Sequence, residues 1–93
     1  MPEYIVFVMP SGDEDAEPFD IPEWGYTEAI ATAERYRAYG WEACIIDYAT
    51  PFAPWRARRL DGPDIGVMAR TRDEAIIRAC AISYDCISFQ RED

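Results

Sequence analysis

Apolar residues are grouped along the chain in short blocks, and their spacing predicts both strands and helices. Residues 4–8 form a continuous β-prone run, Tyr-Ile-Val-Phe-Val, with no polar alternation. Such a run is typical of a central strand that is buried on both faces. Shorter apolar runs at residues 43–46, 65–69 and 86–89 predict three further strands.

The first helix is predicted from apolar residues that recur at helical spacing over residues 29–36. Thr27 is its expected N-cap. Gly40 follows in the C′ position, where glycine commonly ends a helix, and Trp41 can fold back on the last turn.

The second helix begins with a capping box, in which the side chains of Thr71 and Glu74 satisfy each other's end of the helix start. The helix behind it, residues 75–84, is apolar almost all round and carries one charge, at Arg78. We therefore expect it to be the more deeply buried of the two helices.

Prolines and glycines mark the connections between these elements. Residues 9–26 contain three prolines, two glycines and many acids, which predicts a long acidic loop between the first strand and the first helix. The turn-forming sequence at residues 61–64 lies between two β-prone runs, so residues 55–69 are predicted to form a hairpin.

A short internal repeat indicates how the elements are connected. Residues 28–30 and 74–76 both read Glu-Ala-Ile at the start of a helix, and a Cys-Ile pair follows in the next strand. Two strand–helix–strand halves of this kind form the ferredoxin-like βαββαβ arrangement. We therefore predict that residues 1–93 are a single α+β domain, a small two-layer sandwich. It has an antiparallel sheet with two helices on one face and room for an extra hairpin strand at residues 55–60.

The alternative fold is a curled antiparallel sheet with both helices on one face and the 55–69 hairpin inserted. In either fold, the predicted core takes apolar residues from every strand and helix. It consists of Ile5, Phe7, Ile30, Ala33, Ile45, Val67, Ile76, Ala79, Cys80 and Phe89.

The uneven distribution of charge along the chain limits its possible partners more than any other feature of the sequence. At 49% hydrophobic residues, the chain is too apolar to be a disordered acidic tail, despite its net charge of −9. Residues 1–47 hold 11 of the 18 acidic residues and two arginines, whereas residues 48–93 hold seven of each, so the first half carries the whole −9. That field repels nucleic acid and anionic lipid and attracts basic protein surfaces. We expect no direct nucleic-acid or membrane partner and, without an apolar run long enough to span a bilayer, a cytoplasmic location (host cytoplasm if phage-encoded).

Missing residue types narrow the candidate chemistry. The chain has no His and no Lys, and therefore no imidazole metal ligand and no Schiff-base amine. Cys44, Cys80 and Cys86 lie in apolar contexts without CxxC spacing and are expected to be buried, reduced thiols. We expect no catalytic residues, no cofactor and no metal, and hence no enzyme.

The acidic loop is the strongest candidate for function. Seven carboxylates and no cation lie between residues 13 and 28, interleaved with Phe19, Ile21 and Trp24. Large apolar groups beside fixed negative charge are typical of protein-binding hot spots, although the same side chains can fold inward and pin the loop. The predicted partner-binding residues are Asp13, Glu14, Asp15, Glu17, Phe19, Asp20, Glu23, Trp24 and Glu28.

The spacing of Asp13, Asp15 and Glu17 imitates the start of a calcium loop. Such a loop needs Gly at its sixth position and a bidentate Glu at its twelfth, and this chain has Pro18 and Trp24 there. We therefore do not expect a calcium site of that kind.

The basic patch contains the arginines of residues 56–59, together with Arg70 and Arg72 at the far end of the predicted hairpin. Strand alternation places Arg56 and Arg58 on one face. In a chain of net charge −9, we expect these arginines to pair with the chain's own carboxylates or with an acidic patch on a partner. Whether they form a second binding face is left open.

Residues 55–81, with the pattern T-x-x-E-A-I-x-x-A at residues 71–79, resemble the strand–strand–helix unit of HicB-type antitoxins. The resemblance covers less than a third of the chain, and no function is carried across from it. The sequence predicts a small acidic protein-binding module, an inhibitor or adaptor that docks on a basic protein surface or nucleoprotein complex.

Small acidic phage proteins that act against host defences such as CRISPR complexes provide an analogy of size and charge, and a protein of that type would mimic nucleic acid. Two alternatives belong to other classes. One is a small-molecule-binding or enzymatic ferredoxin-like domain. The other is a structural homo-oligomer, of which a homodimer is the simplest.

Overall fold

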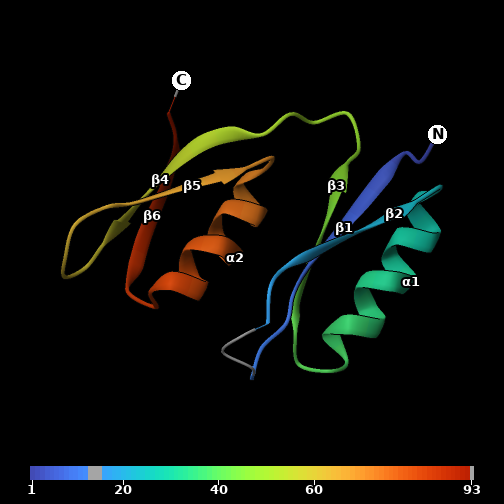
Figure 1. The fold of residues 1–93 in the computed structure, drawn as a ribbon, viewed down its shortest axis with the longest axis horizontal. Helices are drawn as coiled ribbons and strands as arrows, with labels where there is room; N and C mark the ends of the chain where they lie inside the picture. Colours follow the sequence, from blue (N-terminus) through green and yellow to red (C-terminus); the bar gives the residue numbers. More distant parts are fainter. Residues whose placement is uncertain (13–15, 93) are drawn as a thin grey trace. The chain divides into compact units, whose positions relative to one another are not determined.

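The computed structural model describes residues 1–12 and 16–92, and its strands and helices follow the order ββαβββαβ (Figure 1). The chain divides into two compact units, Met1–Thr50 (unit 1) and Pro51–Asp93 (unit 2). The α+β class predicted from the sequence is confirmed. That residues 1–93 form a single domain stays a prediction.

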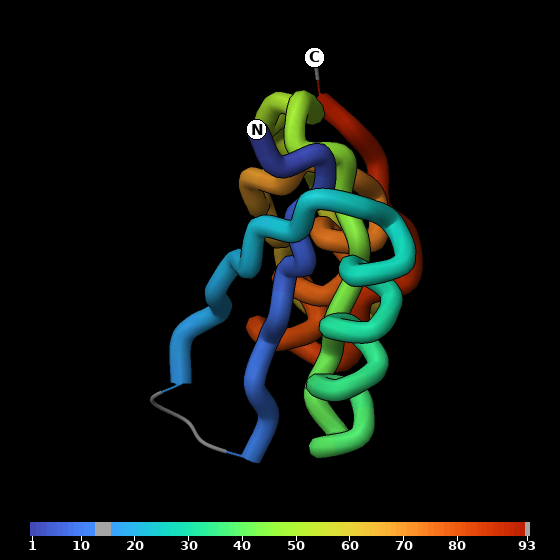
Figure 2. The backbone as a smooth tube through the Cα atoms, turned by 90° about the vertical axis from the view of Figure 1, so that its right-hand side faces the viewer, coloured from blue at the N-terminus to red at the C-terminus, as the bar shows by residue number. Residues whose placement is uncertain are grey.

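Unit 1 is a three-stranded antiparallel sheet with one helix. The central strand β1 (Tyr4–Met9) pairs with β2 (Phe19–Glu23) on one side and β3 (Glu42–Asp47) on the other. The helix α1 (Tyr26–Arg37) joins β2 to β3 and runs alongside β1 and β3 (Figure 2). The buried side chains between helix and sheet are Val6, Val8, Ala29, Ala33 and Ala43.

The central strand is buried on both faces, as its sequence predicts. Val6, Phe7 and Val8 are all 0% exposed. Because successive side chains of a strand point to opposite faces, Val6 and Val8 lie towards α1, whereas Phe7 lies on the other face beside its buried cross-strand partner Cys44.

The acidic connection predicted for residues 9–26 is shorter than expected, because Phe19–Glu23 forms the strand β2. Its register with β1 runs from Tyr4 opposite Glu23 to Val8 opposite Phe19. The prediction of a loop there was wrong because Pro22 and the acidic residues were taken as signs of irregular structure. Both are tolerated on β2 because it is an edge strand, where one row of backbone groups needs no partner.

The start of α1 differs from the prediction and its end agrees with it. The N-cap is Gly25, two residues before the predicted Thr27, and it makes no side-chain capping bond. At the other end, Gly40 has a φ of +84°. Its N–H donates to Arg37 O (2.9 Å), while Trp41 N–H donates to Tyr36 O (3.4 Å). These two bonds form a Schellman motif.

Unit 2 has the same kinds of element. The central strand β4 (Ala53–Arg59) pairs with β5 (Ile65–Ala69) and with β6 (Cys86–Arg91), and α2 (Arg72–Ile82) joins β5 to β6. The predicted 55–69 hairpin and the N-cap at Thr71 are both confirmed.

The two units have one topology, ββαβ, with the first strand in the middle of each sheet. Equivalent positions in β2 and β5, α1 and α2, and β3 and β6 are 46 residues apart; for example, Glu23 and Ala69 occupy the same place in their hairpins. Their partners Tyr4 and Ala53 are 49 residues apart. The first hairpin loop is therefore three residues longer than the second.

This register explains which parts of the internal repeat are structural. Ala29 and Ala33 correspond to Ala75 and Ala79, and all four are 0% exposed. The cysteines do not correspond, because the residue 46 positions after Cys44 is Gln90. Each half also contains one more strand than the predicted strand–helix–strand unit. The βαββαβ order with one sheet is therefore replaced by two ββαβ units, each with a three-stranded sheet.

Small residues dominate the buried positions. Of the predicted core, Phe7, Ala33 and Ala79 are 0% exposed. The other predicted core residues are partly exposed: Ile5, Ile30, Ile45, Val67, Ile76, Cys80 and Phe89. Large side chains were expected in the core, whereas most of the buried apolar residues are alanines, several of them outside the predicted core, such as Ala29, Ala57 and Ala75.

The alanine contacts make a stability prediction with matched controls. Ala33→Leu in α1 and Ala79→Leu in α2 should each lower the free energy of unfolding by about 1–3 kcal/mol, because the added methylenes have no space between helix and sheet. Ala31→Leu and Ala81→Leu, at exposed positions of the same helices, should change it by less than about 0.5 kcal/mol. Urea denaturation measures all four, and equal effects within each helix would contradict the packing.

Candidate interaction surface

The boundary between the units is also a boundary of charge. Residues 48–50 carry no charged side chain, so unit 1 holds 11 carboxylates and two arginines, and unit 2 holds seven of each. Unit 1 therefore has the entire net charge of −9, and unit 2 sums to zero. Two units of one topology differ in charge by nine.

The predicted partner-binding carboxylates lie along one part of unit 1. Asp13, Glu14 and Asp15 fall outside the described residues. Of the others, Glu17 precedes β2, Asp20 and Glu23 are on β2, and Glu28 is in the first turn of α1. Glu17, Asp20 and Glu28 are exposed, and Glu23 is partly exposed.

The apolar residues of the same segment divide into two groups. Ile21 packs against the core of unit 1, and the Phe19 ring lies 5.6 Å from that of Tyr36 on α1. Trp24 instead is 67% exposed. Phe19 begins β2 and Trp24 follows its last residue, so the strand separates them by roughly 15 Å. The structure therefore packs Ile21 against the core, keeps Phe19 in contact with Tyr36 but 37% exposed, and leaves Trp24 at the surface.

An aromatic cluster closes the end of unit 1 where α1 finishes. The Tyr36 ring is 5.8 Å from Trp41 in a stacked arrangement, and 6.0 Å from Tyr39. Phe19 completes the cluster, and Ser11 Oγ–H donates to Gly40 O (3.0 Å) beside it. The sequence signalled only the Trp41 part of this cluster, through Gly40. The Phe19 contact depends on β2, a strand that was not predicted from the sequence.

Both arginines of unit 1 contact uncharged groups. Arg37 donates from Nε (3.2 Å) and Nη2 (2.7 Å) to the carbonyl oxygen of Ala43. The Arg35 guanidinium lies 5.1 Å from the centre of the Tyr36 ring, a cation–π contact. These two cations thus support the end of the helix.

Part of the predicted basic patch pairs with carboxylates of unit 2, one of the two outcomes expected from the net charge. Arg56 pairs with Asp64 (3.8 Å) and with Glu92, and Arg59 Nε donates to Asp85 Oδ1 (2.9 Å). Arg56 and Arg58 are exposed on the same face of β4, as strand alternation predicts.

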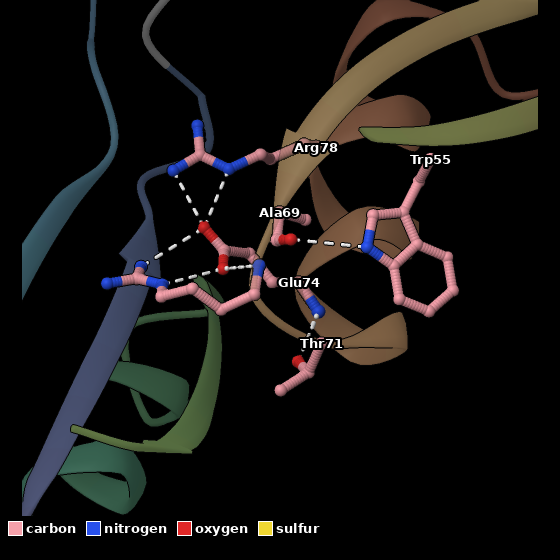
Figure 3. Close-up of polar contacts among 6 residues, drawn as sticks. Trp55, Ala69, Thr71, Glu74 and Arg78 are labelled. Carbon is pink, nitrogen blue, oxygen red and sulfur yellow. Dashed lines mark hydrogen bonds and ion pairs between the residues drawn. The ribbon is translucent and has the colours of Figure 1, made fainter. Parts of the chain in front are cut away.

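Glu74 is the centre of a buried ionic network at the start of α2 (Figure 3). Its side chain is 0% exposed and accepts hydrogen bonds from Arg70, through Nε (2.9 Å), Nη2 (3.1 Å) and the backbone N–H (2.9 Å). Arg78 Nε donates to Glu74 Oε2 (2.8 Å), the same oxygen that accepts from Arg70 Nη2. Glu74 N–H in turn donates to Thr71 Oγ1 (3.3 Å), which is one of the two bonds of the predicted capping box. The Glu74 carboxylate does not complete the box at Thr71 and instead accepts from the backbone N–H of Arg70, the residue before the N-cap.

These contacts set the protonation state of Glu74. Burial alone would raise the pKa of this carboxyl, but the hydrogen bonds from the side chain and backbone of Arg70 and from Arg78 have the larger combined effect, and its pKa is lowered. The Arg70 guanidinium also lies 4.6 Å from the centre of the Phe52 ring. The network therefore holds one carboxylate in its charged form and fixes the start of α2 to the end of β5.

Asp85 is the centre of a second polar network, between α2 and β6. The pKa of Asp85 is lowered to about 2. The main cause is the hydrogen bond from Arg59, and the next is the one from Ser83. Asp61 N–H also donates to Asp85 Oδ2 (3.3 Å), and Leu60 N–H donates to the carbonyl oxygen of Asp85 (2.8 Å). This residue thus connects the turn between β4 and β5 to the segment that follows α2.

The cysteines are less uniform than expected. All three are free thiols, but Cys44 is buried whereas Cys80 and Cys86 are partly exposed, because the ends of α2 and β6 are incompletely covered. Burial is the main cause that raises the pKa of the Cys86 thiol, which disfavours a reactive thiolate. Within residues 1–12 and 16–92, no group of three or more Cys, Asp or Glu is placed to hold a metal ion.

Comparison with known proteins identifies no relative. No protein-family model, no curated protein and no solved structure matches the chain. In the part of the chain that the structure describes, no helix is both long enough and apolar enough to cross a membrane. Any function therefore has to be argued from the surface itself.

The buried network predicts that a substitution of Glu74 has a large effect on the free energy of unfolding. Glu74→Gln removes the anion that pairs with the buried Arg70, and should lower the free energy of unfolding by about 3–5 kcal/mol. Glu28 occupies the equivalent position of α1 and is exposed, so Glu28→Gln should change it by less than about 0.5 kcal/mol. Urea denaturation at neutral pH compares the two, and a small loss at Glu74 would contradict a buried ionic centre.

Asp85 predicts a specific pH dependence. Its folded-state pKa of about 2 lies below the value of about 3.9 for an unfolded aspartate. Its contribution to stability is therefore complete above roughly pH 4 and is lost as the pH falls through about 2. The stability difference between the wild type and Asp85→Asn should shrink over that window, as followed by urea denaturation from pH 7 to pH 2. A difference that stays constant would show that Asp85 is not held as the charged partner of Arg59.

Proposed function

We propose that unit 1 binds a basic protein surface through its exposed carboxylates, and that the chain acts as an inhibitor or adaptor of a basic, nucleic-acid-binding protein. One observation carries this proposal. The whole net charge of −9 belongs to one compact unit, while a unit of the same topology in the same chain sums to zero.

The comparison between the units supports a role for the charge outside the fold. In unit 2, Glu74 and Asp85 are held by arginines in internal networks. In unit 1, Glu17 and Glu28 are exposed, and the ββαβ topology does not need them, because unit 2 forms it with a net charge of zero. A concentrated field of one sign accelerates the association of a partner of the opposite sign.

Aromatic anchors lie among these carboxylates at the start of α1. Trp24 and Tyr26 are 67% and 56% exposed, and they lie between Glu23 and Glu28 in the chain. The Tyr26 ring is held by Tyr4, at a centroid distance of 5.5 Å. Exposed aromatic side chains surrounded by charge are typical of hot spots, where burial of the ring supplies affinity and the charges supply orientation.

Among the described residues, neither carboxyl group with a shifted pKa has the shift that acid–base catalysis requires. Glu74 and Asp85 both have lowered pKa values and are held by arginines. General acid–base catalysis near neutral pH needs the opposite, a carboxyl whose pKa is raised. Neither the Glu74 network nor the Asp85 network therefore supports the enzymatic alternative.

A pull-down from native lysate with the tagged chain tests the proposal. At about 0.1 M salt we expect capture of basic proteins, and at about 1 M salt we expect the capture to be lost, because the Debye length falls from about 10 Å to about 3 Å. The triple variant Glu17→Gln, Glu23→Gln and Glu28→Gln should slow the association of a captured partner roughly tenfold or more at low salt.

A matched variant separates local charge from net charge. Asp61→Asn, Asp64→Asn and Asp73→Asn change the net charge by the same three units at exposed positions of unit 2. Their association rate should stay close to that of the wild type. If both triple variants slow association equally, the binding surface is not on unit 1. Trp24→Ala should act mainly on the dissociation rate, as expected for an aromatic anchor.

A further inference from the structure

The internal repeat makes it possible to compare how each unit covers the end of its helix. Tyr36 and Trp41 in unit 1 correspond, 46 residues later, to Ile82 and Ile87 in unit 2. In unit 1 the two rings stack on each other, and Phe19 and Tyr39 add to the cluster. In unit 2 the isoleucines are 64% and 61% exposed. The position that unit 1 covers with its own aromatic side chains is left uncovered in unit 2.

Two further apolar side chains lie at the same end of unit 2. Leu60 is 76% exposed, and its N–H donates to Asp85 O (2.8 Å), which holds it beside the segment after α2. Tyr84 precedes Asp85 and is 97% exposed. The Cys86 thiol contacts the carbonyl oxygen of Ser83 (3.4 Å), so the start of β6 folds back on the end of α2. The four apolar side chains are called the apolar end patch: Leu60, Ile82, Tyr84 and Ile87.

The polar groups within this patch are already satisfied. Asp85 accepts hydrogen bonds from Arg59, Ser83 and the backbone of Asp61. Arg59 and Asp85 together carry no net charge. A partner surface therefore needs no compensating charge for this ion pair.

We propose that the apolar end patch is a homodimer interface, at which two copies of the chain meet around a two-fold axis. In such an interface a patch faces itself, so an unpaired charge within it would repel its own copy, and here Arg59 and Asp85 neutralise each other. Repulsion between two chains of net charge −9 also favours contact through unit 2, which sums to zero. The four side chains offer on the order of 600 Å² of surface, a large part of the roughly 800 Å² per partner that stable interfaces bury.

Sedimentation equilibrium of the full chain over a concentration series tests this interface. The wild type should approach twice its mass of 10.7 kDa, and salt should strengthen the dimer or leave it unchanged, because salt screens the repulsion between the acidic units. Ile82→Ser with Ile87→Ser should raise the dissociation constant roughly 30-fold or more, as the loss of a hot spot does. A wild type that stays monomeric up to millimolar concentration would overturn the proposal.

Control variants keep the test specific. Met68→Ser, at a position of unit 2 that is 54% exposed, should leave the dissociation constant unchanged, and so should Trp24→Ser in unit 1. A dimer that survives the double isoleucine variant, or that dissociates with Trp24→Ser, would place the interface elsewhere. Thermal melting followed by circular dichroism checks that each variant is folded. The proposal is independent of the acidic partner, whose binding weakens with salt while the dimer does not.

Discussion

The close contact of each helix with its own sheet is the constraint on which both units depend. A pair of alanines four residues apart makes that contact in each helix, Ala29 and Ala33 in α1 and Ala75 and Ala79 in α2, and none is exposed. Such small side chains bring helix and sheet close together and leave little volume for larger ones. Many of the other large apolar residues therefore lie at the ends and edges of the units. They form an aromatic cluster in unit 1 and an uncovered patch in unit 2.

The two units show how one topology can support different distributions of charge. In unit 2, arginines form ion pairs with Glu74 and Asp85, and the buried Glu74 fixes the start of α2 through Arg70 and Arg78. In unit 1 the equivalent residue, Glu28, is exposed. Glu28 therefore has no part in an internal network like that of Glu74, and this contrast is the reason for the proposal that the charge of unit 1 serves binding.

Local signals in the sequence predicted the elements whose boundaries depend on local chemistry. The central strand β1, the hairpin of β4 and β5, the Schellman end at Gly40 and the N-cap at Thr71 all belong to this class. The edge strand β2 was missed because Pro22 suggests a break, and only pairing with β1 shows that an edge position tolerates it. The same limit applies to the candidate surface. Whether Phe19 and Trp24 point inward or outward depends on α1, and the burial of Glu74 depends on Arg70 and Arg78.

Strand pairing within each unit has a consequence for how the chain folds. In the described residues, each sheet is built only from strands of its own unit. The widest pairing in unit 1 joins Tyr4 to Asp47, a separation of 43 residues, and in unit 2 Trp55 pairs with Arg91, a separation of 36 residues. Closing loops of this length costs less conformational entropy than pairing strands across the whole chain, and short sequence separations favour fast folding. Each sheet can therefore nucleate on its own hairpin, and a substitution that slows one sheet need not delay the other.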